Sequence, residues 1–300
     1  MMARIALRVL AAICFLLLYA AAVAQVHVPE PSVNLGDTSF LDGVGGPGLL
    51  VEEIGDAYHS GAPTVNSIGG LTHIAWLSDR RLLRAWLGVE VVSAAAHVNI
   101  GGAGSAGGWG DVTVSPLILQ WKEHNVGGVR IDQRFVFDFN PPTGEYQRSS
   151  GVNLGSNAFS AHPYYAITLF PAKRLETSWR IHYLWNASNN APSRTTGAYS
   201  TQAGQAVHFN ATVGYNVTHR FWIGTNGYYL KQITAPQMNG VILLHSPEQV
   251  GAIGPGLMWQ LGRCFLYANA YHELGVENRP RGNRLVLRIE WVFPTTTRNK

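Results

Sequence analysis

The sequence contains little cysteine and little charge. Of its 300 residues only two are cysteine, and 13% are charged. Two cysteines are too few for a disulfide scaffold. Disorder is excluded by the 11% of aromatic residues, because disordered chains are poor in aromatic side chains. Soluble domains carry about 25% charged residues, so we expect something other than water to cover much of this surface.

Long hydrophobic runs are confined to the N-terminus. Residues 1–24 have the pattern of a secretory signal peptide. Two arginines precede an apolar run from Val9 to Ala20, and Ala22, Val23 and Ala24 form a small-residue cleavage site. A permanent membrane anchor is the alternative, but the run is short for a span of about 20 residues.

Removal of this segment changes both the cysteine count and the charge. Cys14 would leave with it, so the mature chain would hold Cys264 alone and form no internal disulfide. An exported chain without disulfides is typical of the bacterial envelope. Loss of two arginines lowers the formal net charge from +4 to +2. Because the remaining Lys and Arg residues are scattered, we expect no nucleic-acid partner.

Helical periodicity is also scarce, and apolar and polar residues alternate with a period of two instead. In 284–293, Leu285 and Leu287 lie on one face and Arg284 and Arg288 on the other. Such alternation predicts a strand with two unlike faces. The same pattern is clear in 129–139, 175–186 and 206–217. It is less regular in 48–57, 68–77, 84–97, 109–122, 161–171, 220–231, 249–261 and 263–273.

These segments predict about twelve strands of the length that crosses a bilayer, about 9–11 residues. Their connections alternate between short and long. The short ones are 79–81, 123–125, 172–174, 218–219 and 262–263. The long ones are 58–67, 98–108, 140–160, 187–204, 232–248 and 274–283. Outer-membrane barrels have this pattern, with tight periplasmic turns and longer extracellular loops.

We therefore predict an all-β fold, an antiparallel transmembrane β-barrel of about 12 strands with short periplasmic turns and long extracellular loops. The barrel would occupy 48–293, between a periplasmic or plug segment at 25–47 and a C-terminal tail at 294–300. A β-sandwich or a lipocalin-like barrel is the soluble alternative. Aromatic residues near segment ends and the low charge favour the membrane.

The polar strand faces supply the candidate site. If the apolar faces meet lipid, charged side chains line the lumen, where they either interlock as ion pairs or form a polar path. The lumen-lining candidates are Arg130, Asp132, Arg134, Asp138, Arg180, His182, Arg288 and Glu290.

Other motifs point to no catalytic residue, no metal and no cofactor. The glycine patterns at 43–48 and 102–107 lead into strands rather than into the helix that a dinucleotide site needs. The adjacent pairs His59-Ser60 and His245-Ser246 point to opposite strand faces and lie in expected loops. The other histidines, which include His162, His182, His208, His219 and His272, fall in separate segments without the close spacing of a metal site.

Short glycine-dominated motifs across the chain resemble a known family. They are 36–43 (GDTSFLDG), 47–49 (PGL), 110–116 (GDVTVSP), 229–232 (YLKQ), 251 (G), 254–256 (GPG) and 283–284 (NR). The chain resembles the family of outer-membrane proteins named for the meta-pathway of phenol degradation, described as transporters. The resemblance implies an envelope barrel associated with uptake of aromatic or other hydrophobic compounds.

The expected function is passive uptake across the bacterial outer membrane. The expected partners are small hydrophobic or aromatic solutes and outer-membrane lipid, with the oligomeric state left open. The alternative is a non-transporting structural or adhesive barrel whose long loops bind partners.

Overall fold

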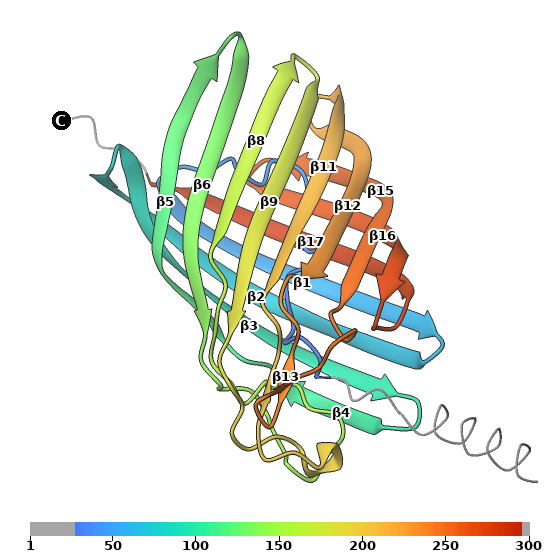
Figure 1. Cartoon of the computed structure of the whole chain (residues 1–300). Helices are drawn as coiled ribbons and strands as arrows, with labels where there is room; N and C mark the ends of the chain where they lie inside the picture. Colours follow the sequence, from blue (N-terminus) through green and yellow to red (C-terminus); the bar gives the residue numbers. More distant parts are fainter. Residues whose placement is uncertain (1–27, 296–300) are drawn as a thin grey trace, which may run out of the picture.

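A computed structural model describes residues 28–295. The expected signal peptide at 1–24 and most of the expected tail lie outside the described residues. Twelve long antiparallel strands close into a barrel, which confirms the predicted fold class (Figure 1). Their bounds are β1 Gly48–Gly61, β2 Thr64–Leu82, β3 Ala85–Ile100, β5 Thr113–Val126, β6 Val129–Asn140, β8 Tyr164–Ala172, β9 Leu175–Asn186, β11 Ala206–Thr218, β12 Phe221–Gln232, β15 Gln249–Leu261, β16 Cys264–Glu277 and β17 Gly282–Pro294.

The barrel closes between its first and last long strands. Leu49 of β1 pairs with Phe293 of β17 on one side and with Trp76 of β2 on the other. Closure leaves no open sheet edge, and every long strand pairs with a neighbour on both sides. Among the described residues, no helix is long and apolar enough to cross a membrane.

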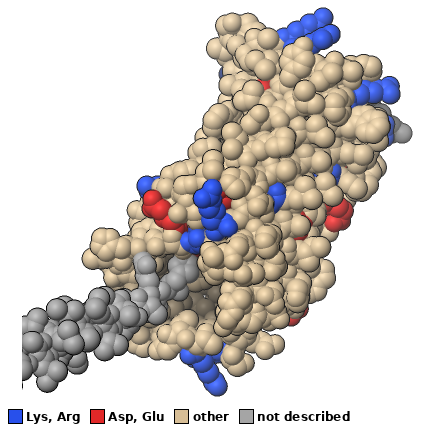
Figure 2. Space-filling model, turned by 90° about the vertical axis from the view of Figure 1, so that its right-hand side faces the viewer, with Lys and Arg blue, Asp and Glu red and all other residues tan. Residues whose placement is uncertain are grey.

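The two faces of the strands differ as the alternation predicts. On β17, Leu285 and Leu287 are about half exposed, at 48% and 53%, whereas Val286 and Arg288 are buried at 0% and 4%. Figure 2 shows the outer surface of one side as mostly uncharged, with Lys and Arg at the top and bottom and a small group of basic and acidic side chains at mid-height. An apolar outer band of this kind suits contact with lipid.

Some expected loops are strands instead. β1 and β2 extend through 58–67 and leave a turn of only Ala62 and Pro63 between them. In 98–108, β3 continues to Ile100 and β4 (Gly104–Trp109) pairs back onto it. Small and polar residues dilute the alternation at these ends, but backbone pairing continues because it does not depend on side-chain polarity.

The expected long loop at 274–283 is also mostly strand, because β16 and β17 extend into it and leave only 278–281 between them. The remaining long connections, which follow β6, β9 and β12, gather at one end of the barrel. There lie the short strands β7 (Ser160–Ala161), β10 (Thr201–Gln202), β13 (Gln237–Met238) and β14 (Val241–Ile242), and the 3-10 turn η1 (Arg194–Thr196). β10, β13 and β14 form a small separate sheet. The opposite end carries the short turns.

Residues 28–47, which we call the lumen segment, lie inside the barrel (Figure 1). Gly36 contacts Asn210 on β11 and Tyr271 on β16, so it touches separated parts of the wall. Glu30 contacts Asn186 at the long-loop end of β9, and Gly48 opens β1 opposite Pro294 at the other end. The segment therefore passes through the lumen from the long-loop end to the short-turn end.

Candidate functional site: the barrel lumen

Asp42 connects the lumen segment to two arginines of the wall. Arg180 on β9 donates two hydrogen bonds to the Asp42 carboxylate, from Nε at 2.8 Å and from Nη2 at 2.5 Å. Arg134 on β6 donates to the Asp42 carbonyl oxygen at 3.0 Å. The Asp42 side chain is 5% exposed. A buried carboxylate held in this two-pronged manner is among the stronger polar contacts in proteins.

Wall side chains also satisfy the backbone of the lumen segment. Asn210 accepts from the Gly36 N–H at 2.8 Å, and Thr168 accepts from the Gly43 N–H at 2.9 Å. Tyr271 donates to the Gly36 carbonyl at 2.8 Å. A Cβ at position 43 would lie 2.6 Å from the Thr168 backbone nitrogen, so the close approach there needs glycine. The backbone of the lumen segment is thus held by side chains of the wall, and the segment does not pair as a strand of the sheet.

The apolar side chains Leu35 and Phe40 of the lumen segment are packed against the wall. Leu35 packs in a cluster with Tyr228 and Leu230. Phe40 packs with Met258 and Tyr267 and is 1% exposed. Burying a side chain of this size contributes about 1.5–3 kcal/mol, so these contacts add to the polar ones in holding the segment.

Two acidic residues of the lumen segment lie where their charge is disfavoured. Asn186 donates to Glu30 at 2.9 Å, and Gln232 donates to its other oxygen. Burial nevertheless raises the pKa of Glu30 to about 8, and the nearby Glu248 carboxyl contributes to this rise. Burial also raises the pKa of Asp37 to about 7, although the Arg284 guanidinium favours the carboxylate.

A second polar network lies within the wall itself. His73 on β2 lies between Glu52 and Glu90, with Nδ1 at 2.8 Å from Glu52 and Nε2 at 3.2 Å from Glu90. Arg288 contacts Glu52 at 3.1 Å. All of these side chains are buried. The network joins strands β1, β2, β3 and β17 across the inner face.

The lumen-lining candidates divide among these networks. Arg134 and Arg180 bind the lumen segment, and Arg288 binds Glu52. Asp138 accepts from Ser115, and Glu290 accepts from Tyr267 at 3.3 Å.

Arg130 and Asp132 form a separate pair at 3.3 Å, and the Arg130 side chain is 42% exposed. His182 stacks on His208.

Sequence reasoning missed the partners of these residues. Asp42 lies outside the alternating segments, and Glu52, His73 and Glu90 lie on strands with weak alternation. Arg284 was on a clear polar face but was not chosen, and it donates to the Leu35 carbonyl at 2.8 Å.

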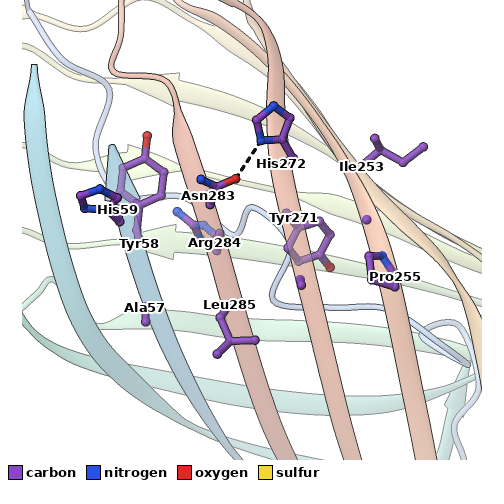
Figure 3. A pocket seen from close by; sticks show the side chains of 12 residues that line it. Ala57, Tyr58, His59, Ile253, Pro255, Tyr271, His272, Asn283, Arg284 and Leu285 are labelled. Carbon is purple, nitrogen blue, oxygen red and sulfur yellow. Dashed lines mark hydrogen bonds between the residues drawn. The ribbon is translucent and has the colours of Figure 1, made fainter. Parts of the chain in front are cut away.

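A pocket of about 530 Å³ lies in the wall formed by β1, β15, β16 and β17 (Figure 3). Ile253 and Gly256 pair with β16, but the intervening Gly254 and Pro255 do not, and proline has no N–H to donate. Ala57, Ala270 and Leu285 are among the lining residues. Half of the twelve lining residues are small or apolar, and the surface that the pocket exposes is mainly apolar, as in sites for apolar ligands.

Two lining residues of this pocket also contact the lumen segment. Tyr271 and Arg284 line the pocket, and the same side chains donate to the carbonyls of Gly36 and Leu35. Figure 3 shows both side chains beside the pocket. They therefore connect the wall pocket to the lumen segment.

The adjacent residues His59 and Ser60, which we expected in a loop, lie on β1. Ser60 donates to the Pro63 carbonyl at 2.6 Å, while His59 Nδ1 lies 2.6 Å from Asn66. The two side chains differ in burial, as neighbours on opposite faces do.

Known proteins share this architecture. Residues 45–289 match the family model described as "Putative MetA-pathway of phenol degradation". The COG4313 outer membrane channel from Pseudomonas putida F1 superposes with a TM-score of 0.73 at 16% identity, covering 87% of this chain and 100% of that one. The β domain of the Bordetella autotransporter BrkA gives a TM-score of 0.50 at 9% identity, covering 82% and 99%. No curated protein matches the sequence. The barrel is of the outer-membrane type, and the protein belongs in the bacterial outer membrane.

Proposed function

Since the chain belongs to the family named for the MetA pathway of phenol degradation, we propose that it is a passive outer-membrane channel for small hydrophobic solutes, aromatic ones among them. The lumen segment acts as its plug. When the segment leaves its wall contacts, the polar inner face becomes a path for solutes.

The observation that carries this proposal is how the lumen segment is held. Its contacts are hydrogen bonds, ion pairs at Asp42 and Asp37, and buried apolar side chains such as Leu35 and Phe40. None of them is a strand pairing, so the segment can leave while the closed barrel keeps all its backbone hydrogen bonds. Displacement is therefore separable from unfolding.

The wall pocket supports the hydrophobic class of solute. A solute that partitions into the outer leaflet meets a site lined by Ala57, Ala270 and Leu285. Tyr271 and Arg284 lie between this site and the backbone of the lumen segment. Binding in the pocket competes with the contacts that hold the segment, which couples the solute to opening.

Planar-bilayer recording combined with liposome swelling tests the proposal. The full mature chain should show brief openings, and swelling should be faster with small aromatic solutes than with sugars of equal size. A barrel that stays silent both with its lumen segment intact and with that segment released would exclude transport. It would leave the alternative of a structural or adhesive barrel acting through its loops.

A further inference from the structure

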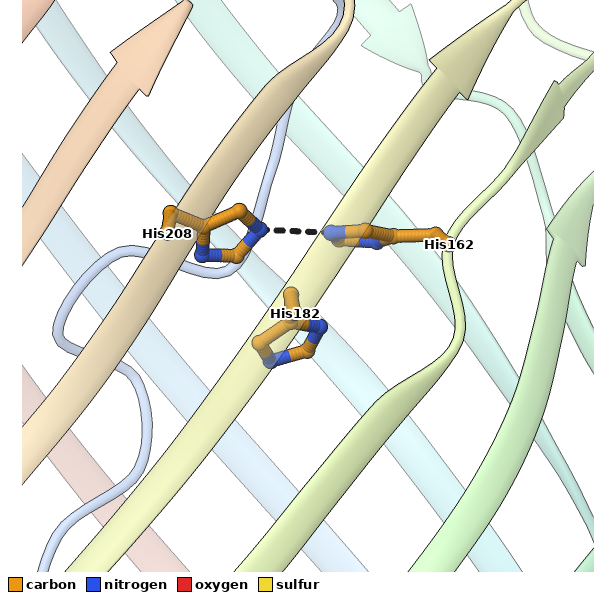
Figure 4. Close-up of side chains that lie close together, drawn as sticks. All are labelled: His162, His182 and His208. Carbon is orange, nitrogen blue, oxygen red and sulfur yellow. Dashed lines mark hydrogen bonds between the residues drawn. The ribbon is translucent and has the colours of Figure 1, made fainter. Parts of the chain in front are cut away.

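Three buried histidines from separate segments meet on the inner wall (Figure 4). His182 lies on β9 and His208 on the adjacent β11, where the two are paired in register. His162 lies in the connection between β7 and β8. One ring nitrogen from each can be chosen so that all three lie within 4.8 Å of one another.

The three rings are close but poorly satisfied as hydrogen-bonding groups. The Nε2 atoms of His162 and His208 are 2.5 Å apart. Neither ring nitrogen of His182 has a hydrogen-bond partner, and neither has Nδ1 of His208. His182 is 3% exposed and His208 is 0% exposed. Buried polar atoms without partners are rare in proteins and call for an explanation.

We propose that His162, His182 and His208 bind a divalent transition-metal ion of the Zn²⁺ class. Imidazole nitrogen is a preferred ligand of zinc, copper and nickel, and three histidines suffice for a zinc site with an open fourth position. Ligation would use a lone pair on each ring, including one on the unpartnered His182. It would also replace the short nitrogen–nitrogen contact of His162 and His208 with two metal bonds.

The geometry needs only small ring movements. Zinc–nitrogen bonds of about 2.0–2.1 Å in a tetrahedral arrangement place two ligand nitrogens about 3.3 Å apart. The His162–His208 separation of 2.5 Å is below this value, and the 4.8 Å limit for the set is above it. Ligation therefore requires the Nε2 atoms of His162 and His208 to move apart by about 0.8 Å, which rotation of the two imidazole rings can supply.

One positively charged side chain lies close to the three rings. Arg180 is two residues from His182 on the same strand, and its guanidinium donates two hydrogen bonds to the Asp42 carboxylate. The Tyr164 ring contacts His182, with centroids 4.9 Å apart. Among the described residues, the group contains no carboxylate or thiolate. The ligands are thus neutral imidazoles, which favour Zn²⁺, Cu²⁺ or Ni²⁺ over the oxygen-seeking Ca²⁺ and Mg²⁺.

The site joins three parts of the wall beside the lumen segment. A bound ion would link β9, β11 and the connection that enters β8. On β9, His182 lies two residues from Arg180, which binds Asp42 of the lumen segment. Metal binding that occurs only in the folded barrel stabilises it by mass action. This inference does not depend on transport.

Metal binding to the purified, tag-free full chain tests the proposal. After chelator treatment, titration with Zn²⁺ should give one equivalent of tight binding, and Mg²⁺ or Ca²⁺ should give none. The variants H182A and H208A should each lose that equivalent. The matched control H219A, at an exposed turn at the short-turn end, should keep it.

A second measurement covers variants that fail to fold. Co²⁺ added to the unaltered chain should give the intense visible bands of a tetrahedral nitrogen site, and Zn²⁺ should remove them. Heat-modifiable gel migration identifies the variants that form a barrel. Absence of the Co²⁺ bands, or equal Zn²⁺ binding by a folded H182A variant and its parent, would overturn the assignment.

Discussion

Arg180 donates two hydrogen bonds to the carboxylate of Asp42, a residue 138 positions earlier in the chain. One partner is on the wall of the barrel and the other is in the lumen segment. This contact joins the two parts whose separation would open the channel. The predictions below test what depends on it.

Replacing Asp42 with asparagine should release the lumen segment. The variant keeps the side-chain shape but leaves the Arg180 and Arg134 guanidinium groups without their counter-charge. Breaking a buried ion pair costs about 3–5 kcal/mol, which corresponds to an increase of about 100-fold or more in the open population. Single-channel recording measures this directly. Asp79→Asn, on an exposed part of β2, is the matched control and should behave as the parent. Equal open probabilities in D42N and D79N would contradict the role of Asp42.

Opening should increase with pH. The pKa values of Glu30 and Asp37 are raised to about 8 and about 7 in the docked segment. The docked state therefore binds protons more tightly than the free segment, so docking is most stable below the free-carboxyl pKa of about 4 and weakens up to about pH 8. Conductance recorded at steps from about pH 5 to about pH 9 should rise through that window. Glu30→Gln should remove the portion of the conductance rise that lies near pH 8. A conductance that does not change with pH in the parent would count against burial of Glu30 and Asp37.

Filling the wall pocket should slow uptake of hydrophobic solutes. Ala270 lines the pocket, whereas Ala268 lies two residues away on the same face of β16 and does not line it. Ala270→Phe should reduce swelling with aromatic solutes severalfold, and Ala268→Phe should leave it unchanged. Both variants should keep the ionic conductance of the parent. Equal swelling rates in the two variants would remove the pocket from the route.

The two arginines that bind Asp42 should set ion selectivity in the open state. Arg134→Ala combined with Arg180→Ala opens the channel by removing the anchor and also removes two positive charges from the lumen. D42N opens it with both charges present. Reversal potentials in a salt gradient should therefore show D42N more anion-selective than the double variant. Identical reversal potentials would show that ions do not pass these side chains.

Much of the barrel could be predicted because its physical causes are local. The alternation of Leu285 and Leu287 with Arg284 and Arg288 assigns each residue to a face, and the exposed fractions agree. The extra length of β1 and β2 could not be predicted, because Ser60, Gly61 and Ser67 give no apolar signal.

The contacts across the lumen could not be predicted from the sequence, for a different reason. Asp42 and Arg180, or His162 and His208, meet only because the register and closure of the strands bring distant segments together. Spacing along the chain detects ligands on one element, not ligands on three.

The most direct test locks the lumen segment in place. Asn210 donates to Thr38 at 2.9 Å between Nδ2 and Oγ1, so Thr38→Cys and Asn210→Cys place one thiol on the lumen segment and one on the wall that faces it. Titration of free thiols after oxidation establishes that the disulfide has formed. The pair is introduced with Cys264→Ser in the D42N background, and conductance is recorded before and after reduction. The account predicts a silent channel when the disulfide is formed and frequent openings once it is reduced. Equal conductance in the oxidised and reduced states would contradict the claim that residues 28–47 close the path.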